Sequence, residues 1–265
     1  MSSDSAPHHS GENVMRRPFS WFVLAISAVL IAGNFAKAET PADVVKKAIE
    51  AHGGADNLKK YAAAKIAAKG KIFLMGLEIA VEMETTYLLP DMFKNIMKMD
   101  ILCQKVTIVQ VYNAGKVKMT ANGMDTPVSD TQKAELQESM NLQHAQQLTP
   151  LLEGQKYELT LIDNPANVGS KEVVGITVKS KDRKDFKLFF DKATNLLVRI
   201  ERRGLNEAEK EVDQQITYSA HKKFDGIMRP VKTEFLMDGK KFMEGEVSEY
   251  KHLDKVDKKV FDLSD

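Results

Sequence analysis

Residues 41–88 decide the fold and read PADVVKKAIEAHGGADNLKKYAAAKIAAKGKIFLMGLEIAVEMETTYL. Thr40 precedes Pro41, and this pair predicts a helix start, because threonine caps helix N-termini and proline favours the first helical position. Gly53 and Gly54 predict the end of that helix. The apolar residues between these signals recur at helical spacing and are Val44, Val45, Ala48 and Ile49. The first expected element is therefore a short amphipathic helix.

The next segment, residues 65–84, has apolar residues at every second position, which is typical of half-buried strands. The alternation breaks at Met75 and Gly76 and then resumes, so these two residues are expected to form a hairpin loop. That loop places Lys69 opposite Glu82 on one face, where such pairs are worth about 0.2–1 kcal/mol each. The other face is apolar. A slip of one residue would exchange the faces, so the pattern specifies the register.

The first 38 residues have the order of a secretory signal peptide. Arg16 and Arg17 precede an apolar run over residues 19–32, and a small-x-small motif ends at Ala38. We expect cleavage after Ala38, with Met15 as an alternative start, and a single domain over residues 39–265. An uncleaved N-terminal membrane anchor is the alternative, and the arginine pair leaves Sec and Tat export both open.

Charge and cysteine content narrow the class of protein. Residues 1–38 hold three of the 38 basic and two of the 37 acidic residues, so the remainder carries 35 of each sign. A neutral chain argues against binding to nucleic acid and against electrostatic capture by anionic membranes. Cys103 is the only cysteine, so no internal disulfide can form and the core must supply the stability.

The rest of the chain predicts mostly strands, with one long helix between them. Ser129 and Gln132 have capping-box spacing, and an apolar stripe follows until Gly154. Tight turns such as Asp225-Gly226 punctuate the later strands, while the charged residues 201–211 interrupt the strand pattern. The expected fold is mainly β (α+β), with about eleven antiparallel strands in one curved sheet and two helices.

No catalytic motif is present, so an enzyme is not expected, and neither is a cofactor. The histidines after residue 38 lie in four different segments, without the spacing of metal ligands. Met97-x-Met99 alone is similar to copper-binding motifs, which leaves a copper protein or a hydrolase as the least favoured class. Seven of the thirteen methionines lie between Met75 and Met124, which indicates either core packing or an adaptable surface for apolar ligands.

Several stretches resemble the LolA/LolB-like outer-membrane lipoprotein-sorting family. They are residues 48–54 (AIEAHGG), 66–72 (IAAKGKI), 111–116 (VYNAGK), 191–196 (DKATNL) and 225–230 (DGIMRP). The resemblance implies an incomplete β-barrel with a helical lid over an apolar cavity, in a protein of the periplasm. Family members carry or receive lipid-modified proteins. The residue directly after Ala38 is Glu39 and not a cysteine, so the lipid-anchored acceptor role is not expected.

The resemblance also implies which residues meet a ligand. The lid would contribute Leu136, Met140, Leu148 and Leu152, and the cavity wall Leu74, Ile79, Val81, Met83 and Ile96. The expected function is a monomeric, carrier-like protein that holds lipid or lipoprotein acyl chains non-covalently. The alternative is an envelope protein-interaction or sensor module that keeps the same fold but fills the cavity with its own side chains.

Overall fold

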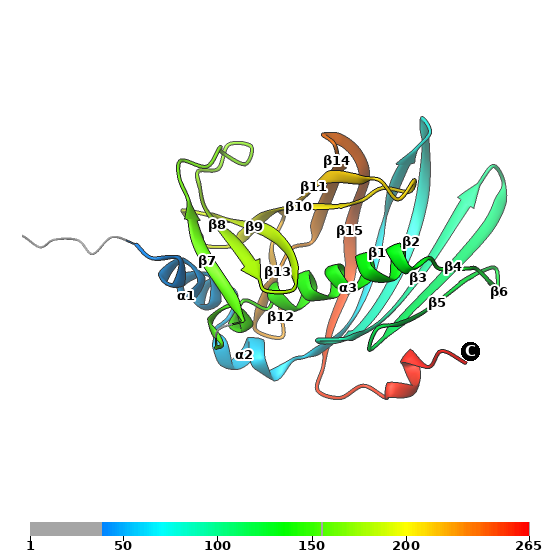
Figure 1. The fold of residues 1–265 in the computed structure, drawn as a ribbon, viewed down its shortest axis with the longest axis horizontal. Helices are drawn as coiled ribbons and strands as arrows, with labels where there is room; N and C mark the ends of the chain where they lie inside the picture. The colour runs from blue at the N-terminus through cyan, green and yellow to red at the C-terminus, as the bar shows by residue number, and fades with distance from the viewer. Residues whose placement is uncertain (1–38, 155, 265) are drawn as a thin grey trace, which may run out of the picture. The chain divides into compact units, whose positions relative to one another are not determined.

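One antiparallel sheet of thirteen strands forms the framework (Figure 1). The computed structural model describes residues 39–154 and 156–264, so the expected signal peptide lies outside the described residues. The sheet order is β6 (Met124–Asp125), β5 (Lys116–Ala121), β4 (Gln104–Asn113), β3 (Met92–Ile101), β2 (Leu77–Leu88), β1 (Ala63–Leu74), β15 (Lys240–Leu253), β14 (Lys232–Met237), β11 (Glu211–Ser219), β10 (Leu197–Leu205), β9 (Arg183–Asp191), β8 (Val173–Ser180) and β7 (Tyr157–Ile162). The end strands β6 and β7 do not pair, which confirms an incomplete barrel, with more strands than the expected count of about eleven.

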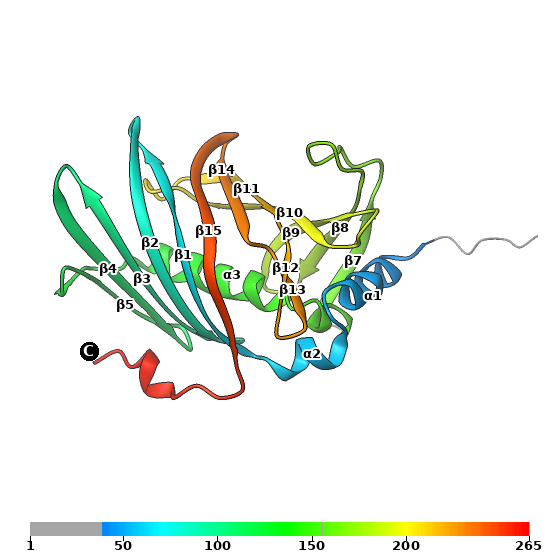
Figure 2. The same cartoon turned by 180° about the vertical axis from the view of Figure 1, so that it is seen from behind.

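Helices and one small hairpin complete the part of the chain that the structure describes (Figure 2). They are α1 (Pro41–Ala51), α2 (Ala55–Lys60), α3 (Asp130–Ala145), the 3-10 helices η1 (Thr149–Leu152) and η2 (Lys258–Phe261), and the strands β12 (Lys222–Phe224) and β13 (Ile227–Arg229). Within these described ranges, no helix combines the length and the apolar character needed to cross a bilayer.

The first hairpin has the predicted register. Leu74 pairs with Leu77 and Lys69 pairs with Glu82 across the turn at Met75 and Gly76. The Lys69 Nζ lies 2.8 Å from the Glu82 carboxylate, so the charged face forms as expected. The predicted N-cap of α1 is also confirmed, because the side chain of Thr40 accepts a hydrogen bond from the backbone N–H at position 43.

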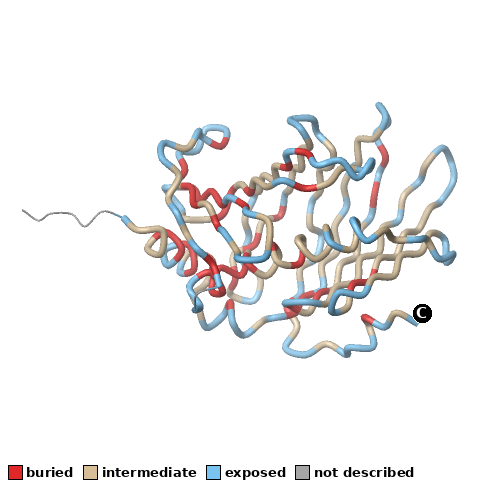
Figure 3. Tube along the Cα trace, in the orientation of Figure 1, coloured by how far each residue is buried: buried red, intermediate tan, exposed pale blue. Residues whose placement is uncertain are grey.

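Buried residues are distributed unevenly along the sheet (Figure 3). The main core lies where α1 and η1 pack on β7–β10, with Phe190, Leu188 and Ile200 fully buried. A smaller core joins α3 to β1, β2 and β4 through Met140, Tyr87 and other residues. The strands β1–β5 are otherwise mostly half-buried, so this part of the sheet is the less covered one.

The long helix is shorter than the sequence predicted. Its start is confirmed, because Ser129 and Gln132 form the expected capping box. It ends at Ala145 and not near Gly154, and Leu148 follows with a positive φ of 63°. Pro150 explains the difference, because a proline disfavours the α conformation in the preceding residue and offers no N–H to a continuing helix.

Gly70 lies where the backbones of β1 and β15 approach closely. A Cβ atom at this position would lie 2.0 Å from the Glu244 carbonyl oxygen. The register shift in this pairing lies two to three residues earlier, between Ala67 and Ala68. Gly70 is therefore required for close strand approach, in agreement with one common reason for glycine inside a strand.

The substitution Gly70→Val should destabilise the fold by at least about 3 kcal/mol, because the new side chain collides with the backbone of β15. Ala68→Val is the matched control, since Ala68 already holds a Cβ on the same strand. Urea unfolding of both variants measures the difference. Equal unfolding free energies would contradict this role of Gly70.

His52 connects the end of α1 to β10. Its Nδ1–H donates to the Ala48 carbonyl over 2.7 Å, and its Nε2 accepts from the Leu197 backbone N–H over 3.4 Å. Only the neutral ring makes the two bonds at the same time, because a protonated Nε2 could not accept. Burial lowers the pKa of His52 to about 4, since desolvation disfavours the charged ring.

Acidification should therefore weaken the fold between pH 6.5 and about pH 4. The unfolded ring takes up a proton around pH 6.5 and the native ring only near pH 4. Between these values the unfolded state binds more protons, so the unfolding free energy decreases as the pH is lowered. In His52→Gln, the loss of unfolding free energy on acidification should be smaller by roughly 3 kcal/mol. Urea titrations at several pH values test this, and an unchanged pH dependence in the variant would count against it.

Candidate functional site

The candidate site is the apolar surface of β1–β5 on the side of the sheet that α3 crosses (Figure 1). Strand alternation and the pairing registers give this surface, the concave face, an apolar lining that is crossed by one polar row of Thr85, Asn95 and Gln110. The large residues that share the face are Ile66, Ile72, Leu74, Leu77, Ile79, Val81, Met83, Met97, Met99, Ile108 and Met119. Most of them are only half-buried, which is unusual for so many large apolar side chains on one surface.

Four of the residues predicted for the cavity wall lie on the concave face. Leu74 and Met83 are half-buried, whereas Ile79 and Val81 are buried. Their common orientation follows from the hairpin register, which pairs Ile79 with Ile72 and Met83 with Ala68. The structure therefore brings these four side chains to one surface, as the alternation indicated.

Ile96 lies on the opposite, charged face and does not join them. It pairs with Glu84 and lies beside Lys98, whereas the neighbouring Met97 and Met99 point to the concave face. Both parities of this strand contain apolar residues, so the apolar pattern alone was ambiguous. The charges at alternate positions with Ile96 were the signal that identifies its face.

The lid helix α3 contributes two of the four predicted lid residues. Leu136 and Met140 pack against Tyr87 and Tyr112, residues of β2 and β4. Leu148 lies beyond the helix end and is fully buried in the main core, and Leu152 lies at the end of η1, partly exposed. The predicted stripe is split because the helix ends at Ala145.

The other side of α3 is held by charged groups. Arg202 of β10 donates through Nη2 to Glu135 (2.6 Å) and to Ser139 (3.3 Å), and through Nε to Gln214 (2.8 Å). Its side chain is only 11% exposed, and burial lowers the pKa of the guanidinium while the nearby carboxylates oppose this. Glu138 of α3 accepts from the backbone N–H at position 184. The lid is thus apolar towards β1–β4 and polar towards β9–β11.

The charged residues 201–211 do not interrupt the sheet, in contrast to the sequence-based expectation. They form the end of β10, its turn and the start of β11. Arg202 from this segment holds α3, and Glu209 in the turn accepts from the Ser129 hydroxyl at the N-cap of α3 over 3.0 Å. Three consecutive charged residues, 201–203, concealed the β character of this strand, and no local signal predicted these contacts.

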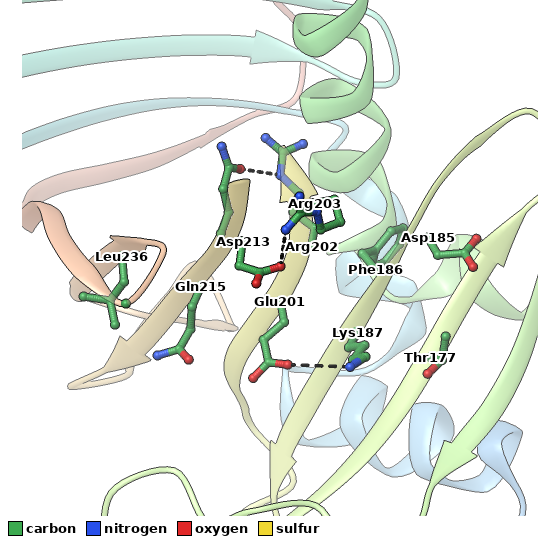
Figure 4. A pocket seen from close by; sticks show the side chains of 12 residues that line it. Thr177, Asp185, Phe186, Lys187, Glu201, Arg202, Arg203, Asp213, Gln215 and Leu236 are labelled. Carbon is green, nitrogen blue, oxygen red and sulfur yellow. Dashed lines mark hydrogen bonds and ion pairs between the residues drawn. The ribbon is translucent and has the colours of Figure 1, made fainter. Parts of the chain in front are cut away.

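A groove of about 480 Å³ lies over β8–β11 and β14 (Figure 4). Its walls carry charges that pair with one another, as Arg203 does with Asp213 at 2.8 Å. Figure 4 also shows Lys187 beside Glu201, at 3.9 Å. None of the residues predicted to bind a ligand lines it. All charged side chains that line this groove are paired except that of Asp185, which has no partner among the described residues, and a lone carboxylate offers no evident chemistry.

A second hollow, of about 440 Å³, runs beside α3 and includes Met140, Tyr112 and His144. Burial lowers the pKa of His144, and Lys156 adds to this effect. Within residues 39–154 and 156–264, no group of three or more His, Cys, Asp or Glu side chains could hold a metal ion. The described histidines thus offer no assembled metal site.

Comparison with known proteins places the fold. Scans against protein-family models and curated sequences gave no match.

Three solved structures share the architecture at low identity. A DUF1329 family protein from Desulfovibrio piger has a TM-score of 0.55 at 13% identity, covering 85% of this chain and 98% of that one. A LolA superfamily protein from Nitrosomonas europaea gives 0.54 at 11%, with the same coverage. A putative outer membrane lipoprotein-sorting protein domain from Vibrio parahaemolyticus gives 0.51 at 9%, covering 84% and 96%. The chain therefore has a LolA-like fold.

Proposed function

We propose that this protein is a periplasmic carrier that holds acyl chains of lipids or lipoproteins on its concave face, without a covalent bond, during outer-membrane lipoprotein sorting. The observation that carries the proposal is a half-buried apolar sheet face beneath a helix that is held on one side by polar contacts. The fold shared with a lipoprotein-sorting domain supports it. In this role the chain is a monomer that binds and transfers its ligand and catalyses no reaction.

The energetics of such a carrier are those of acyl-chain burial. Each buried CH₂ group contributes about 0.8 kcal/mol, in a protein as in a membrane. Transfer therefore requires a protein surface whose affinity for the acyl chain is close to that of the membrane. This surface must also open and close without a large barrier. Met83, Met97 and Met99 suit this requirement, because flexible thioether side chains adapt to ligands of different shape.

A second candidate function is docking of an envelope protein. Met75 and Leu102, at the tips of the β1–β2 and β3–β4 hairpins, are 94% and 81% exposed. Ile79 and Val81 of the predicted wall are already buried by the protein's own side chains. A stable partner that co-purifies through these tips, with no lipid bound, would favour this second function.

The direct test of the carrier is lipid extraction. Residues 39–265, expressed in the periplasm and extracted with organic solvent, should release acyl lipids that mass spectrometry identifies. A fluorescent fatty-acid probe should bind the delipidated protein and be displaced by such lipids. Absence of bound lipid together with absence of probe binding would refute the carrier.

Two adjacent substitutions test which face binds. Met97→Glu places a carboxylate on the concave face and should weaken probe binding at least about tenfold, because burial of a charge beside an acyl chain is unfavourable. Ile96→Glu, one residue away on the charged face, is the matched control and should bind as the wild type does. An equal loss of probe affinity in fluorescence titrations of both variants would argue against binding on the concave face.

The lid contact is tested with Arg202→Ala. This variant leaves Glu135 without its closest partner and should lower the unfolding free energy by about 3 kcal/mol. Hydrogen exchange in residues 130–145 should accelerate, because α3 then opens more often. Arg203→Ala removes a neighbouring, exposed ion pair and should cost less than about 1 kcal/mol. Unchanged exchange of α3 in Arg202→Ala would show that this contact does not hold the lid.

A further inference from the structure

Arg229 is a buried positive charge that lacks a carboxylate partner. The residue ends β13 and is only 7% exposed, and within the described ranges no acidic oxygen lies within 4.0 Å of its guanidinium. Its Nη2 donates to the Gln147 side-chain oxygen over 3.0 Å, while its Nε–H finds no acceptor among the residues that the structure describes. Arg202, which is similarly buried, has Glu135 at 2.6 Å. Burial of a cation without an anion is unfavourable, so this arrangement requires a reason.

The groups around Arg229 are also incompletely satisfied. The side-chain nitrogen of Gln147 is buried and has no acceptor. His252 bonds through Nδ1 to Asp225 at 3.2 Å, which occupies the one acidic group of this cluster, and its Nε2 is unmatched. The guanidinium lies 5.6 Å from the centre of the Tyr250 ring, and the Tyr250 hydroxyl lies 2.7 Å from the Tyr87 hydroxyl. The unmatched donors beside Tyr250 are therefore the Nε–H of Arg229 and the side-chain N–H groups of Gln147, whereas Nε2 of His252 is an acceptor because Nδ1–H donates to Asp225.

This cluster lies at one end of the concave face. Tyr250 pairs with Ile66 of β1, and Tyr87 lies on the same face of β2, in the apolar cluster beneath Met140 of α3. From Ile66 the apolar face continues along β1 to Leu74, over a length of about 26 Å for eight residues. An extended acyl chain on this face would therefore have one end beside the two tyrosines.

We infer that Arg229 binds the carboxylate of a free fatty acid whose chain lies on the concave face. The carboxylate would accept hydrogen bonds from the Arg229 guanidinium and from one of the hydroxyls of Tyr87 and Tyr250, because the other hydroxyl donates to its neighbour. A guanidinium edge fits a carboxylate in a two-pronged hydrogen bond, which is stronger and more directional than a neutral one. This inference rests on the proposed function, because it names the head group of the acyl ligand.

Two further observations favour a terminal carboxylate. The unmatched nitrogens are enclosed, so the group that reaches them must be small and must end the molecule, whereas the phosphodiester of a phospholipid continues to a second substituent. The Gln147 oxygen now bonded to Nη2 is a neutral acceptor in the place of an anion. Gln147 lies between α3 and η1, and rotation of its side chain away from the Arg229 Nη2 would admit the head group.

Calorimetric titration of the full-length protein with three twelve-carbon ligands tests the inference. The ligands are laurate, 1-dodecanol and dodecyl phosphate. Laurate should bind at least about tenfold more tightly than 1-dodecanol, which has the same chain without the charge. Arg229→Gln should reduce laurate affinity about tenfold and leave dodecanol affinity unchanged. Arg203→Gln, an exposed arginine on the opposite face, is the control and should bind both ligands as the wild type does.

The possible outcomes separate this inference from the proposed function. Equal wild-type affinities for laurate and dodecanol would overturn the carboxylate site and leave the carrier intact. Tighter binding of dodecyl phosphate than of laurate would also overturn it, in favour of a terminal phosphate. Binding of none of the three would refute the carrier itself. If Arg229→Gln does not fold, the wild-type comparison alone still decides, and Arg229→Lys, which keeps the charge without the planar edge, should bind laurate at an intermediate level.

Discussion

The pairing of β1 with β15 is the constraint on which the rest of the structure depends. Strands β1–β6 follow one another along the sheet in one direction and β7–β15 approach from the other, so the two series meet only at this pair. The backbones approach so closely there that Gly70 has no room for a Cβ. One continuous sheet therefore requires the last strand of the chain to join the first, and this is the role of the C-terminal strands.

The continuous sheet gives α3 two different surfaces. On one side Leu136 and Met140 meet apolar residues of β2 and β4. On the other side Arg202 and the backbone of β9 bind the helix carboxylates Glu135 and Glu138. The Arg202–Glu135 contact is nearly buried, so breaking it is costly, whereas the apolar contacts resemble those of an acyl chain. The polar side is therefore the firm attachment of α3, and the apolar side is the one that an acyl chain would replace in the proposed carrier.

Two buried arginines in this domain have opposite environments. Arg202 is neutralised by Glu135 and serves the lid. Arg229 donates to the amide oxygen of Gln147 and lies over the ring of Tyr250, and among the described residues no carboxylate pairs with it. Since both lie in positions where charge is costly, the contrast is informative: the first arginine completes a structural contact, and the second is incomplete without a ligand.

The sequence by itself determined the local geometry of the chain. The alternation around Met75 and Gly76 specified the hairpin register, and Ser129 with Gln132 specified where the lid begins, because these features depend on neighbours a few residues apart. The alternation also predicted that Leu74, Ile79, Val81 and Met83 share one face of the sheet. Ile96 was misplaced because both parities of its strand are apolar, and the helix end was misplaced because its apolar stripe continues past Ala145.

Only the tertiary structure decided how distant groups meet. Arg202 lies 67 positions from Glu135, and Arg229 lies 82 positions from Gln147, so no local pattern could connect them. The pairing of β1 with β15, the division of α3 into apolar and polar sides, and the unpaired charge beside Tyr250 all depend on the path of the whole chain. The physical reason is that side-chain periodicity encodes which face a residue takes, whereas the partner that covers this face is set by long-range packing.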